Sequence, residues 1–517
     1  MPNPPRARRI PALLLAAVAT SVVALVATTL STPAVAATHS SSSRVGATHS
    51  KKANAHWTRA VRAKHALARA TKALAADTPA AERPDATLAL RSLFLLKDAL
   101  SPADRAAADK LSQRPSKPAV VGDANILVHY DPAELSPTGY TVEQALATLQ
   151  YVSETYANSG YRRPKSDGTK GGDGRIDIYL DSLEPGLYGY CTTDQKKLSK
   201  PGHYDVWAYC VLDNDYAGFP AHTPLENLQV TAAHEYYHAT QFAYDIADDG
   251  WFLEATAVVM EDELYDDVND NYQYLRDSPI THPSKPIDKF GGVFHYGVWN
   301  FFRYLIEKYP AKTGALPTLL LKAWKNADSS KGPRKDMYST QAINKALKQV
   351  GHTSMAEQFA DYSAATRATH VVFNEGTALN YPVKRLGGQA SVNSGKRKSF
   401  KTKLDHLTSA TYQFVPGAGT SKLKLLLKMA PKSAGSRAVV AIYGTGGTLT
   451  FKTIRISGHG IGHKKIPFDG ASVAAVEVTL VNASTRYRDC YRTSTPYACS
   501  GRPMDDNLKA QVQGKAS

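Results

Sequence analysis

Apolar and polar positions alternate along this chain in patterns that change near residues 119 and 381. Between those positions, short apolar runs alternate with longer segments whose apolar residues recur every three or four positions. Helical spacing of this kind predicts amphipathic helices, and strict alternation predicts half-buried strands. The elements expected in this region cover residues 125–130, 141–156, 175–180, 205–212, 251–263, 298–306, 316–324 and 355–365. Residues 119–380 are therefore predicted to form a mixed α+β domain.

After residue 381 the pattern changes to short alternating runs separated by Gly, Ser and Lys. The expected strands cover residues 409–415, 423–429, 438–443 and 473–481. Regular short strands of this kind are typical of a sandwich or a jelly roll. We therefore predict an all-β sandwich or jelly-roll domain over residues 381–517.

The first 118 residues read as targeting and processing segments. Arg8 and Arg9 precede an apolar run over residues 10–30, and small residues at 34–36 form a cleavage site. This pattern predicts a signal peptide over residues 1–36 and a secreted, extracellular protein with no membrane segment after cleavage. An uncleaved membrane anchor is the alternative. Residues 37–118 then read as a propeptide, with helices at 85–98 and after Ser101 joined to a polar tether.

Charge is distributed unevenly over these regions. Residues 1–118 carry a net charge of +12, residues 119–380 carry −12, and residues 381–517 carry +16. A basic flank could dock on the acidic middle region or hold the protein on an anionic cell-wall polymer. A plain stabilising role for the C-terminal domain is the alternative. Nucleic acid is not expected as a partner, because no helix-turn-helix, zinc-finger or aromatic RNA-binding signature occurs.

The chain has four cysteines in two sequence-local pairs. We predict the disulfides Cys191–Cys210 and Cys490–Cys499, since neither pair has metal-ligand spacing and an exported protein folds in an oxidising compartment. No cysteine precedes Cys191. Inhibition of a metal site by a thiol of the pro-region is therefore excluded.

The candidate chemistry begins at the motif HEYYH. His234 and His238 are four residues apart, so on a helix both imidazoles point to one face and can bind one Zn²⁺ ion. Glu235 is placed to accept a proton from a metal-activated water. The longer three-histidine form of this motif is absent, because Tyr244 stands where its third histidine would be and Gln241 replaces its glycine. The spacing predicts a zinc site that needs another ligand.

A carboxylate on the next predicted helix can supply that ligand. Glu254 lies in the first turns of the helix over residues 251–263 and can pack against the HEYYH helix. Glu261 is seven residues further on, on the same helical face, where it can orient one of the histidines from behind.

These motifs carry a family resemblance. HEYYH followed by WFLEA resembles the gluzincin group of zinc metallopeptidases, and residues 85–310 look more specifically like a family of secreted bacterial metallopeptidases. The resemblance implies a zincin-like fold with a mixed sheet, an active-site helix and a helical lobe. It also implies His234, His238 and Glu254 as zinc ligands and Glu235 as the base. Ala255 departs from the glycine of many relatives.

Peptide hydrolysis also needs a donor to the oxyanion. Gluzincins use a tyrosine or a histidine there, and we expect Tyr296 rather than His295 to take this role; an aromatic packing residue is the alternative. We further expect the strand at residues 205–212 to be an edge strand along which an extended peptide could lie.

Calcium is a second cofactor that the sequence leaves open. The loop over residues 167–173 has the acidic residues and glycines of a Ca²⁺ loop without the EF-hand spacing, which favours a plain turn. The acidic stretch over residues 262–270 could bind Ca²⁺ or simply be solvated.

The sequence thus predicts a secreted zinc metalloendopeptidase, made as a zymogen, whose substrate is a protein or peptide. The competing hypothesis is a catalytically silent surface-binding protein that works through its basic β-domain. Exopeptidase action would need a group that binds a chain terminus, and the sequence does not identify one.

Overall fold

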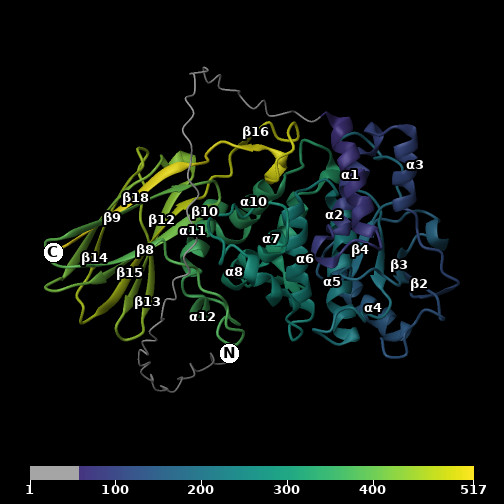
Figure 1. Ribbon diagram of the computed structural model, residues 1–517, viewed down its shortest axis with the longest axis horizontal. Helices are drawn as coiled ribbons and strands as arrows, with labels where there is room; N and C mark the ends of the chain where they lie inside the picture. Colours follow the sequence, from purple (N-terminus) through teal and green to yellow (C-terminus); the bar gives the residue numbers. More distant parts are fainter. Residues whose placement is uncertain (1–57) are drawn as a thin grey trace, which may run out of the picture. The chain divides into compact units, whose positions relative to one another are not determined.

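The computed structural model describes residues 58–517 (Figure 1). The predicted signal peptide and the first part of the predicted pro-region lie outside the described residues. Residues 58–517 belong to one compact unit. Its mixture of helices and strands agrees with the predicted α+β class. No helix within residues 58–517 is long and apolar enough to cross a membrane.

A five-stranded sheet lies at the centre of the first half of this unit. Its order is β1-β2-β3-β5-β4, with parallel pairing of β2, β3 and β5 and antiparallel pairing at both edges. Its strands are β1 (Ala119–Gly122), β2 (Ile126–Tyr130), β3 (Ile176–Asp181), β4 (Gly189–Thr192) and β5 (Tyr209–Asp213). The prediction of an edge strand at 205–212 is wrong, because β4 pairs with β5 and occupies that edge.

Helices cover both faces of this sheet, and alternate residues of its strands face each layer. One layer consists of α1 (Arg59–Leu74), α2 (Ala86–Leu96) and α3 (Pro102–Leu111), which share an apolar core with Tyr179, Tyr209 and Val211. The other layer includes α4 (Val142–Asn158) and α5 (Pro224–Asp245), which pack on Ile178, Leu180 and Leu212. This alternation is the two-residue period of a strand that is buried on both sides.

A group of helices follows α5 and extends its apolar core. Its members are α6 (Gly250–Leu264), α7 (Phe294–Gly297), α8 (Trp299–Lys308), α9 (Thr318–Asn326), α10 (Ser339–Gly351), α11 (Met355–Ala365) and α12 (Thr369–Val372), with a small hairpin of β6 (Lys312–Thr313) and β7 (Leu316–Pro317) between α8 and α9. Helix α6 packs directly against α5. This contact brings the second predicted ligand segment to the first.

The chain from residue 388 onward forms two further main sheets. The first has the order β13-β12-β15-β10-β8 and the second the order β14-β11-β18-β9. Their strands are β8 (Gly388–Val392), β9 (Arg397–Leu404), β10 (Thr408–Pro416), β11 (Lys422–Lys428), β12 (Ser436–Gly444), β13 (Leu449–Thr453), β14 (Ile461–Pro467), β15 (Val473–Asn482) and β18 (Leu508–Ala516). Phe414 and Val478 from one sheet and Leu425 and Val512 from the other belong to one apolar core.

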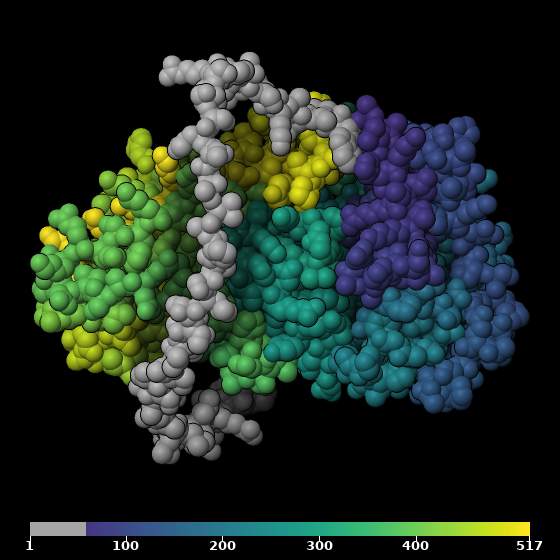
Figure 2. Space-filling model, viewed as in Figure 1, coloured from purple at the N-terminus to yellow at the C-terminus, as the bar shows by residue number. Residues whose placement is uncertain are grey.

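The C-terminal region contacts the helices at two places. Helix α11 packs on β12 and β15, and Arg367 forms an ion pair with Glu477 of β15 at 2.8 Å. The segment that contains β16 (Tyr487–Arg488) and β17 (Arg502–Pro503) reaches back to the start of α6, where Cys499 N–H donates to Asp249 Oδ1 at 2.7 Å. In Figure 2 the yellow atoms of the late chain lie against the teal atoms of this region.

Both predicted disulfides are confirmed. Cys191 of β4 is joined to Cys210 of β5, and Cys490 is joined to Cys499 in the segment that reaches α6. Within residues 58–517 there is no free cysteine. The first bond fixes β4 at the sheet edge that faces α5.

Candidate metal centre

Helix α5 carries the HEYYH motif through the middle of the first half of the molecule. Its start is fixed by a capping box, in which Thr223 Oγ1 accepts from Glu226 N and the Glu226 carboxylate accepts from Thr223 N, and by Pro224 in the first turn. Residues from Leu228 onward are buried almost without interruption. A helix surrounded by protein on all sides holds its histidines in fixed positions.

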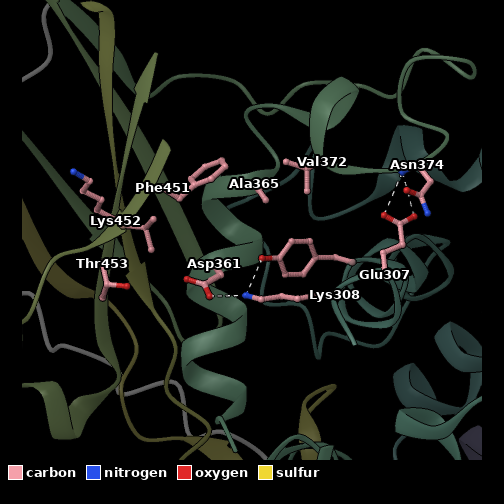
Figure 3. A pocket seen from close by; sticks show the side chains of 11 residues that line it. Glu307, Lys308, Asp361, Ala365, Val372, Asn374, Phe451, Lys452 and Thr453 are labelled. Carbon is pink, nitrogen blue, oxygen red and sulfur yellow. Dashed lines mark hydrogen bonds and ion pairs between the residues drawn. The ribbon is translucent and has the colours of Figure 1, made fainter. Parts of the chain in front are cut away.

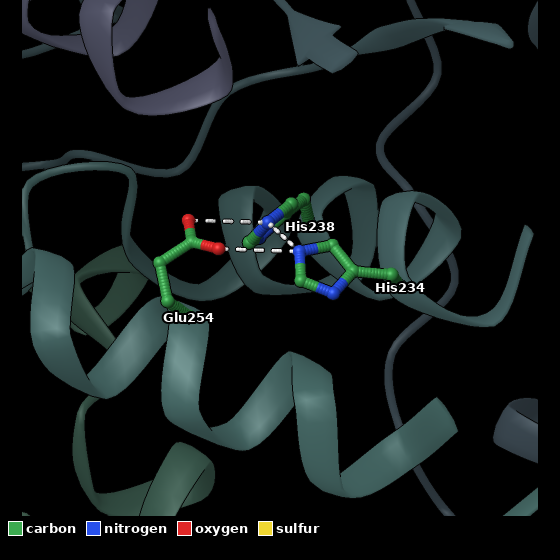
Figure 4. A group of neighbouring side chains, drawn as sticks. All are labelled: His234, His238 and Glu254. Atoms are coloured by element: carbon green, nitrogen blue, oxygen red, sulfur yellow. Dashed lines mark hydrogen bonds and ion pairs between the residues drawn. The ribbon is translucent and has the colours of Figure 1, made fainter. Parts of the chain in front are cut away.

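The side chains of His234, His238 and Glu254 converge between α5 and α6 (Figure 4). The two Nε2 atoms are 3.0 Å apart, Glu254 Oε2 lies 3.2 Å from His234 Nε2, and Glu254 Oε1 lies 3.3 Å from His238 Nε2. Ligand atoms around a tetrahedral zinc ion at its usual bond lengths are about 3.3 Å apart. The observed spacing therefore fits one such ion.

The Nδ1 atom of each histidine has a hydrogen-bond partner on the side of the ring away from Glu254. His238 Nδ1 lies 2.7 Å from Gln241 Oε1, while the amide nitrogen of Gln241 donates to Leu253 O at 3.0 Å. Since Gln241 presents its oxygen, His238 Nδ1 must carry the proton and Nε2 keeps a free lone pair. His234 Nδ1 lies 2.5 Å from Glu261 Oε1, the position expected for a residue that orients the ring.

The electrostatics of this group also suit a cation. Burial raises the pKa of Glu261 to about 7, and burial together with the charge of Glu254 raises the pKa of Asp85 to about 6. Burial likewise raises the pKa of Glu235. Burial would also raise the pKa of Glu254, but the two histidines outweigh it and lower that pKa. Crowded, desolvated carboxylates are stabilised by a bound dication.

Glu235 is 6% exposed and is held by a residue that sequence reasoning missed. Thr87, near the start of α2, donates its hydroxyl hydrogen to Glu235 Oε2 at 3.2 Å. The same hydroxyl oxygen accepts from Cys191 N of β4 at 3.0 Å. Thr87 therefore joins the candidate base to the edge strand of the sheet.

Tyr296 of α7 lies near His234 and lines the adjoining cavity, whereas His295 does not line it. The Tyr296 ring lies 6.3 Å from the His234 ring, and its hydroxyl donates to Asp85 Oδ2. Asp85 is the N-cap of α2, and its Oδ1 accepts from Leu88 N. His295 is almost fully buried, and burial lowers its pKa to about 4.

A cavity of about 250 Å³ opens beside this group, and its lining includes Asp85, Thr87 and Tyr296. One wall is the segment before β4, including Gly186 and Tyr188, and another is the start of α2. The floor includes His234 and Glu235. The cavity therefore has the candidate base, one of the three candidate ligands and the edge strand of the sheet on its surface, while His238 and Glu254 are fully buried beside it.

A separate cavity of about 510 Å³ lies where α8 and α11 meet β13 (Figure 3). Lys308 bridges Asp361 at 2.8 Å on its wall, and Phe451 and Lys452 line the opposite side. Its lining includes no histidine or cysteine. It lacks the donor set that distinguishes the metal centre.

The two acidic segments considered for Ca²⁺ are largely paired with cations. In the 167–173 loop, Asp167 pairs with Arg114, and Asp173 pairs with Arg175 at 2.6 Å. In the second segment, Asp262 pairs with Arg303, although oxygens of Asp262, Asp266 and Glu375 do come together. Calcium binding stays a prediction.

Comparisons with known proteins assign no family to this chain. No protein-family model and no curated protein matches it. Among solved structures, it is similar to the pre-peptidase C-terminal domain of a collagenase from Bacillus anthracis, at 9% identity and a TM-score of 0.16 over 25% of this chain and 96% of that one. It is also similar to a periplasmic inhibitor of g-type lysozyme from Aeromonas hydrophila, at 9% identity and a TM-score of 0.15 over 25% of this chain and 98% of that one. Likenesses this weak carry no functional argument, and the resemblance to gluzincins stays a prediction.

Proposed function

We propose that this protein is a secreted, zinc-dependent peptidase. The observation that carries the proposal is the convergence of His234 Nε2, His238 Nε2 and the Glu254 carboxylate on one point. Glu235 lines the same cavity as His234. Two neutral imidazoles and a carboxylate are a ligand set typical of catalytic zinc, which keeps one further position open. The placement of α5 under a mixed sheet supports a zincin-like fold for this half of the chain.

The residues of the chain have distinct roles in the proposed reaction. Zinc bound there would supply Lewis acidity toward a peptide carbonyl and a water molecule. Glu235 accepts the proton of that water and passes it to the leaving amine, and its raised pKa suits a group that must both take and give a proton. The Tyr296 hydroxyl, once released from Asp85, can donate to the oxygen that becomes negative.

The cavity walls indicate how a peptide would bind. The backbone before β4 lies on the cavity wall, and β4 is the edge strand of its sheet. An extended peptide can pair with such an edge through its main chain. Binding through the main chain suits internal peptide bonds, which supports an endopeptidase.

The remaining parts of the proposal are supported more indirectly. Two disulfides suit a protein that folds outside the cytosol. The apolar core shared by two sheets after residue 388 supports the predicted β-sandwich domain. Export by the segment at residues 1–36 remains part of the proposal. Zymogen processing does so too, at a site that leaves α2 and its Thr87 in the active protein.

The deciding experiment combines metal analysis with peptide hydrolysis. Wild-type protein should bind one zinc ion and hydrolyse an unfolded protein substrate, and a chelator should abolish the activity. Glu235→Gln should keep zinc but lose kcat by about 10²–10⁴-fold, because the proton acceptor is gone. A fully active Glu235→Gln protein would contradict the mechanism.

The third ligand can be tested by zinc affinity alone. Glu254→Gln should weaken zinc binding by more than the roughly 10–100-fold that is usual for a residue behind a ligand. Glu307→Gln serves as a control, because Glu307 lines the separate cavity. Equal zinc affinity in wild type and Glu254→Gln would rule out Glu254 as a ligand.

A further inference from the structure

The outer face of the sheet β14-β11-β18-β9 carries an ordered array of positive side chains. Leu423, Leu425 and Leu427 of β11 point into the core, so the alternate residues of that strand point away from it. None of the four strands contains Asp or Glu. The exposed cations of this face, which we call the basic face, are Arg397, Lys401, Lys403, Lys422, Lys424, Lys428, Lys465, Lys509 and Lys515.

Four of these cations form one row across the sheet. The strand register places Lys465 opposite Lys424, Lys424 opposite Lys515, and Lys515 opposite Arg397. Neighbouring strands are about 4.8 Å apart, so the row presents one positive charge per strand over about 14 Å. At the other end of the strands, Lys401, Lys403, Lys428 and Lys509 line a groove of about 590 Å³.

This arrangement opposes the stability of the fold. Like charges directly opposite each other on neighbouring strands destabilise a sheet. Within residues 58–517, none of the nine side chains has an ion-pair partner that would offset the repulsion. Lysines often protect sheet edges from aggregation, but β11 and β18 are paired on both sides, so edge protection does not explain Lys424, Lys428, Lys509 or Lys515.

We propose that the basic face is a binding site for a linear polyanion that carries a phosphate or a carboxylate on each repeating unit. A polymer lying across the strands can place successive anions against Lys465, Lys424, Lys515 and Arg397 and so relieve their repulsion. A lipid surface fits less well. A face that inserts into a bilayer combines cations with exposed large apolar residues, and within the described chain none of those lies in these four strands.

The test compares two variants of the full-length protein with equal net charge. The row variant is Arg397→Gln, Lys424→Gln, Lys465→Gln and Lys515→Gln. The control variant is Lys325→Gln, Arg334→Gln, Lys345→Gln and Lys348→Gln, which removes four exposed cations outside the β-sheets. Binding to inorganic polyphosphate and to polygalacturonate is measured by titration calorimetry at several salt concentrations, which separates phosphate from carboxylate recognition.

The row variant should bind the preferred polymer roughly 10-fold more weakly or worse, with the salt slope reduced by about 3, while the control variant binds like wild type. Its melting temperature should equal or exceed that of wild type, since repulsion is removed. Equal loss of binding in both variants, no loss in the row variant, or binding to phosphatidylglycerol vesicles in preference to both polymers would overturn the proposal. Peptide hydrolysis should be unchanged in both variants, so this site and the metal centre are tested independently.

Discussion

At the residue scale, the metal centre depends on groups that fix side chains rather than on the ligands alone. Gln241 sets the tautomer of His238, and Glu261 holds the ring of His234. Thr87 holds the side chain of Glu235 in place in a similar way, because its hydroxyl donates a hydrogen bond to the Glu235 carboxylate. A base that is held in one rotamer is already oriented toward the group whose proton it accepts. Loss of the contact that holds it should therefore lower kcat.

Thr87→Val tests this contact with almost no change of shape. The variant removes the hydrogen bond to Glu235 and leaves Cys191 N without its acceptor. A hydrogen bond to a charged group is worth about 1.5–3 kcal/mol, so kcat in the peptide assay should fall roughly 10–100-fold while zinc content stays the same.

Thr87→Ser is the matched control because it keeps the hydroxyl. It should restore most of kcat and most of any loss in melting temperature. A Thr87→Val protein with wild-type kcat, or a serine variant as slow as the valine variant, would show that the hydroxyl does not position Glu235.

The distance in sequence decides which of these residues could be predicted. His234, Glu235 and His238 share one helix, and Glu254 and Glu261 share the next, so local spacing is enough to group them. Thr87 lies 148 residues before Glu235, and Asp85 lies 211 residues before Tyr296. Those contacts join the start of α2 to α5 and α7, and no periodicity within any of these segments determines how they pack together.

At the element scale, the layer α1–α3 buries its inner face against the sheet. Leu90 and Leu93 of α2 are almost completely buried, as are Tyr190 and Val211 on the sheet beneath them. A propeptide that leaves after maturation would expose this face. We therefore expect the layer to contribute to the stability of the protein that carries the metal centre.

Leu93→Ala measures that contribution. Replacing a buried leucine by alanine removes apolar contacts and leaves a cavity, so the free energy of unfolding should fall by about 2–5 kcal/mol in chemical denaturation. Val61→Ala is the control within the same layer, because Val61 is exposed and should matter little. If both variants unfold like wild type, the layer is not a stabilising part of the cooperative unit.

Composition explains which elements the sequence pattern missed. Helix α1 buries only alanines, namely Ala63, Ala66, Ala70 and Ala73, so its apolar stripe is too weak to distinguish from a polar tether. Strand β9 carries Arg397, Ser399, Lys401 and Lys403 on its outer face and has no run of Val, Ile or Leu. The long helices and the strands rich in Val, Ile and Leu agree with their predicted positions within a few residues, because their periodicity is strong.

At the scale of the whole molecule, one buried cluster connects the β-sheets to the helices that carry the metal centre. Asp288 precedes α7, and its Oδ2 accepts hydrogen bonds from the Tyr487 hydroxyl and from Ala498 N. His406, in the turn between β9 and β10, lies between two carboxylates. Its Nε2 is 3.0 Å from Asp288 Oδ1, and its Nδ1 is 2.7 Å from Asp506 Oδ1. The neighbouring Cys499 N–H bonds to Asp249, which is the N-cap of α6. Loss of these hydrogen bonds would therefore loosen the start of α6, the helix that contains Glu254.

His406 makes the stability of this connection dependent on pH. Burial would lower its pKa, but the charge of Asp288 and the hydrogen bonds to Asp288 and Asp506 outweigh burial and raise the pKa to about 9. A group whose pKa is raised on folding stabilises the fold below its unfolded pKa, near 6.5, and that stability is lost as the pH rises through 9. The full contribution is about 3 kcal/mol.

The measurable quantity is the difference in unfolding free energy between wild type and His406→Gln, because other groups titrate in the same range. Burial lowers the pKa of Lys384 to about 7, for example, so that group favours folding increasingly as the pH rises. In the difference its effect cancels, and the value should be largest below pH 6.5 and shrink toward pH 9.5 or so. His459→Gln, at an exposed turn away from this cluster, is the control for loss of a histidine and should unfold like wild type. A constant difference for His406→Gln as well would mean that the imidazolium does not hold Asp288 and Asp506 together, and that the connection between the β-sheets and α6 rests on its uncharged hydrogen bonds.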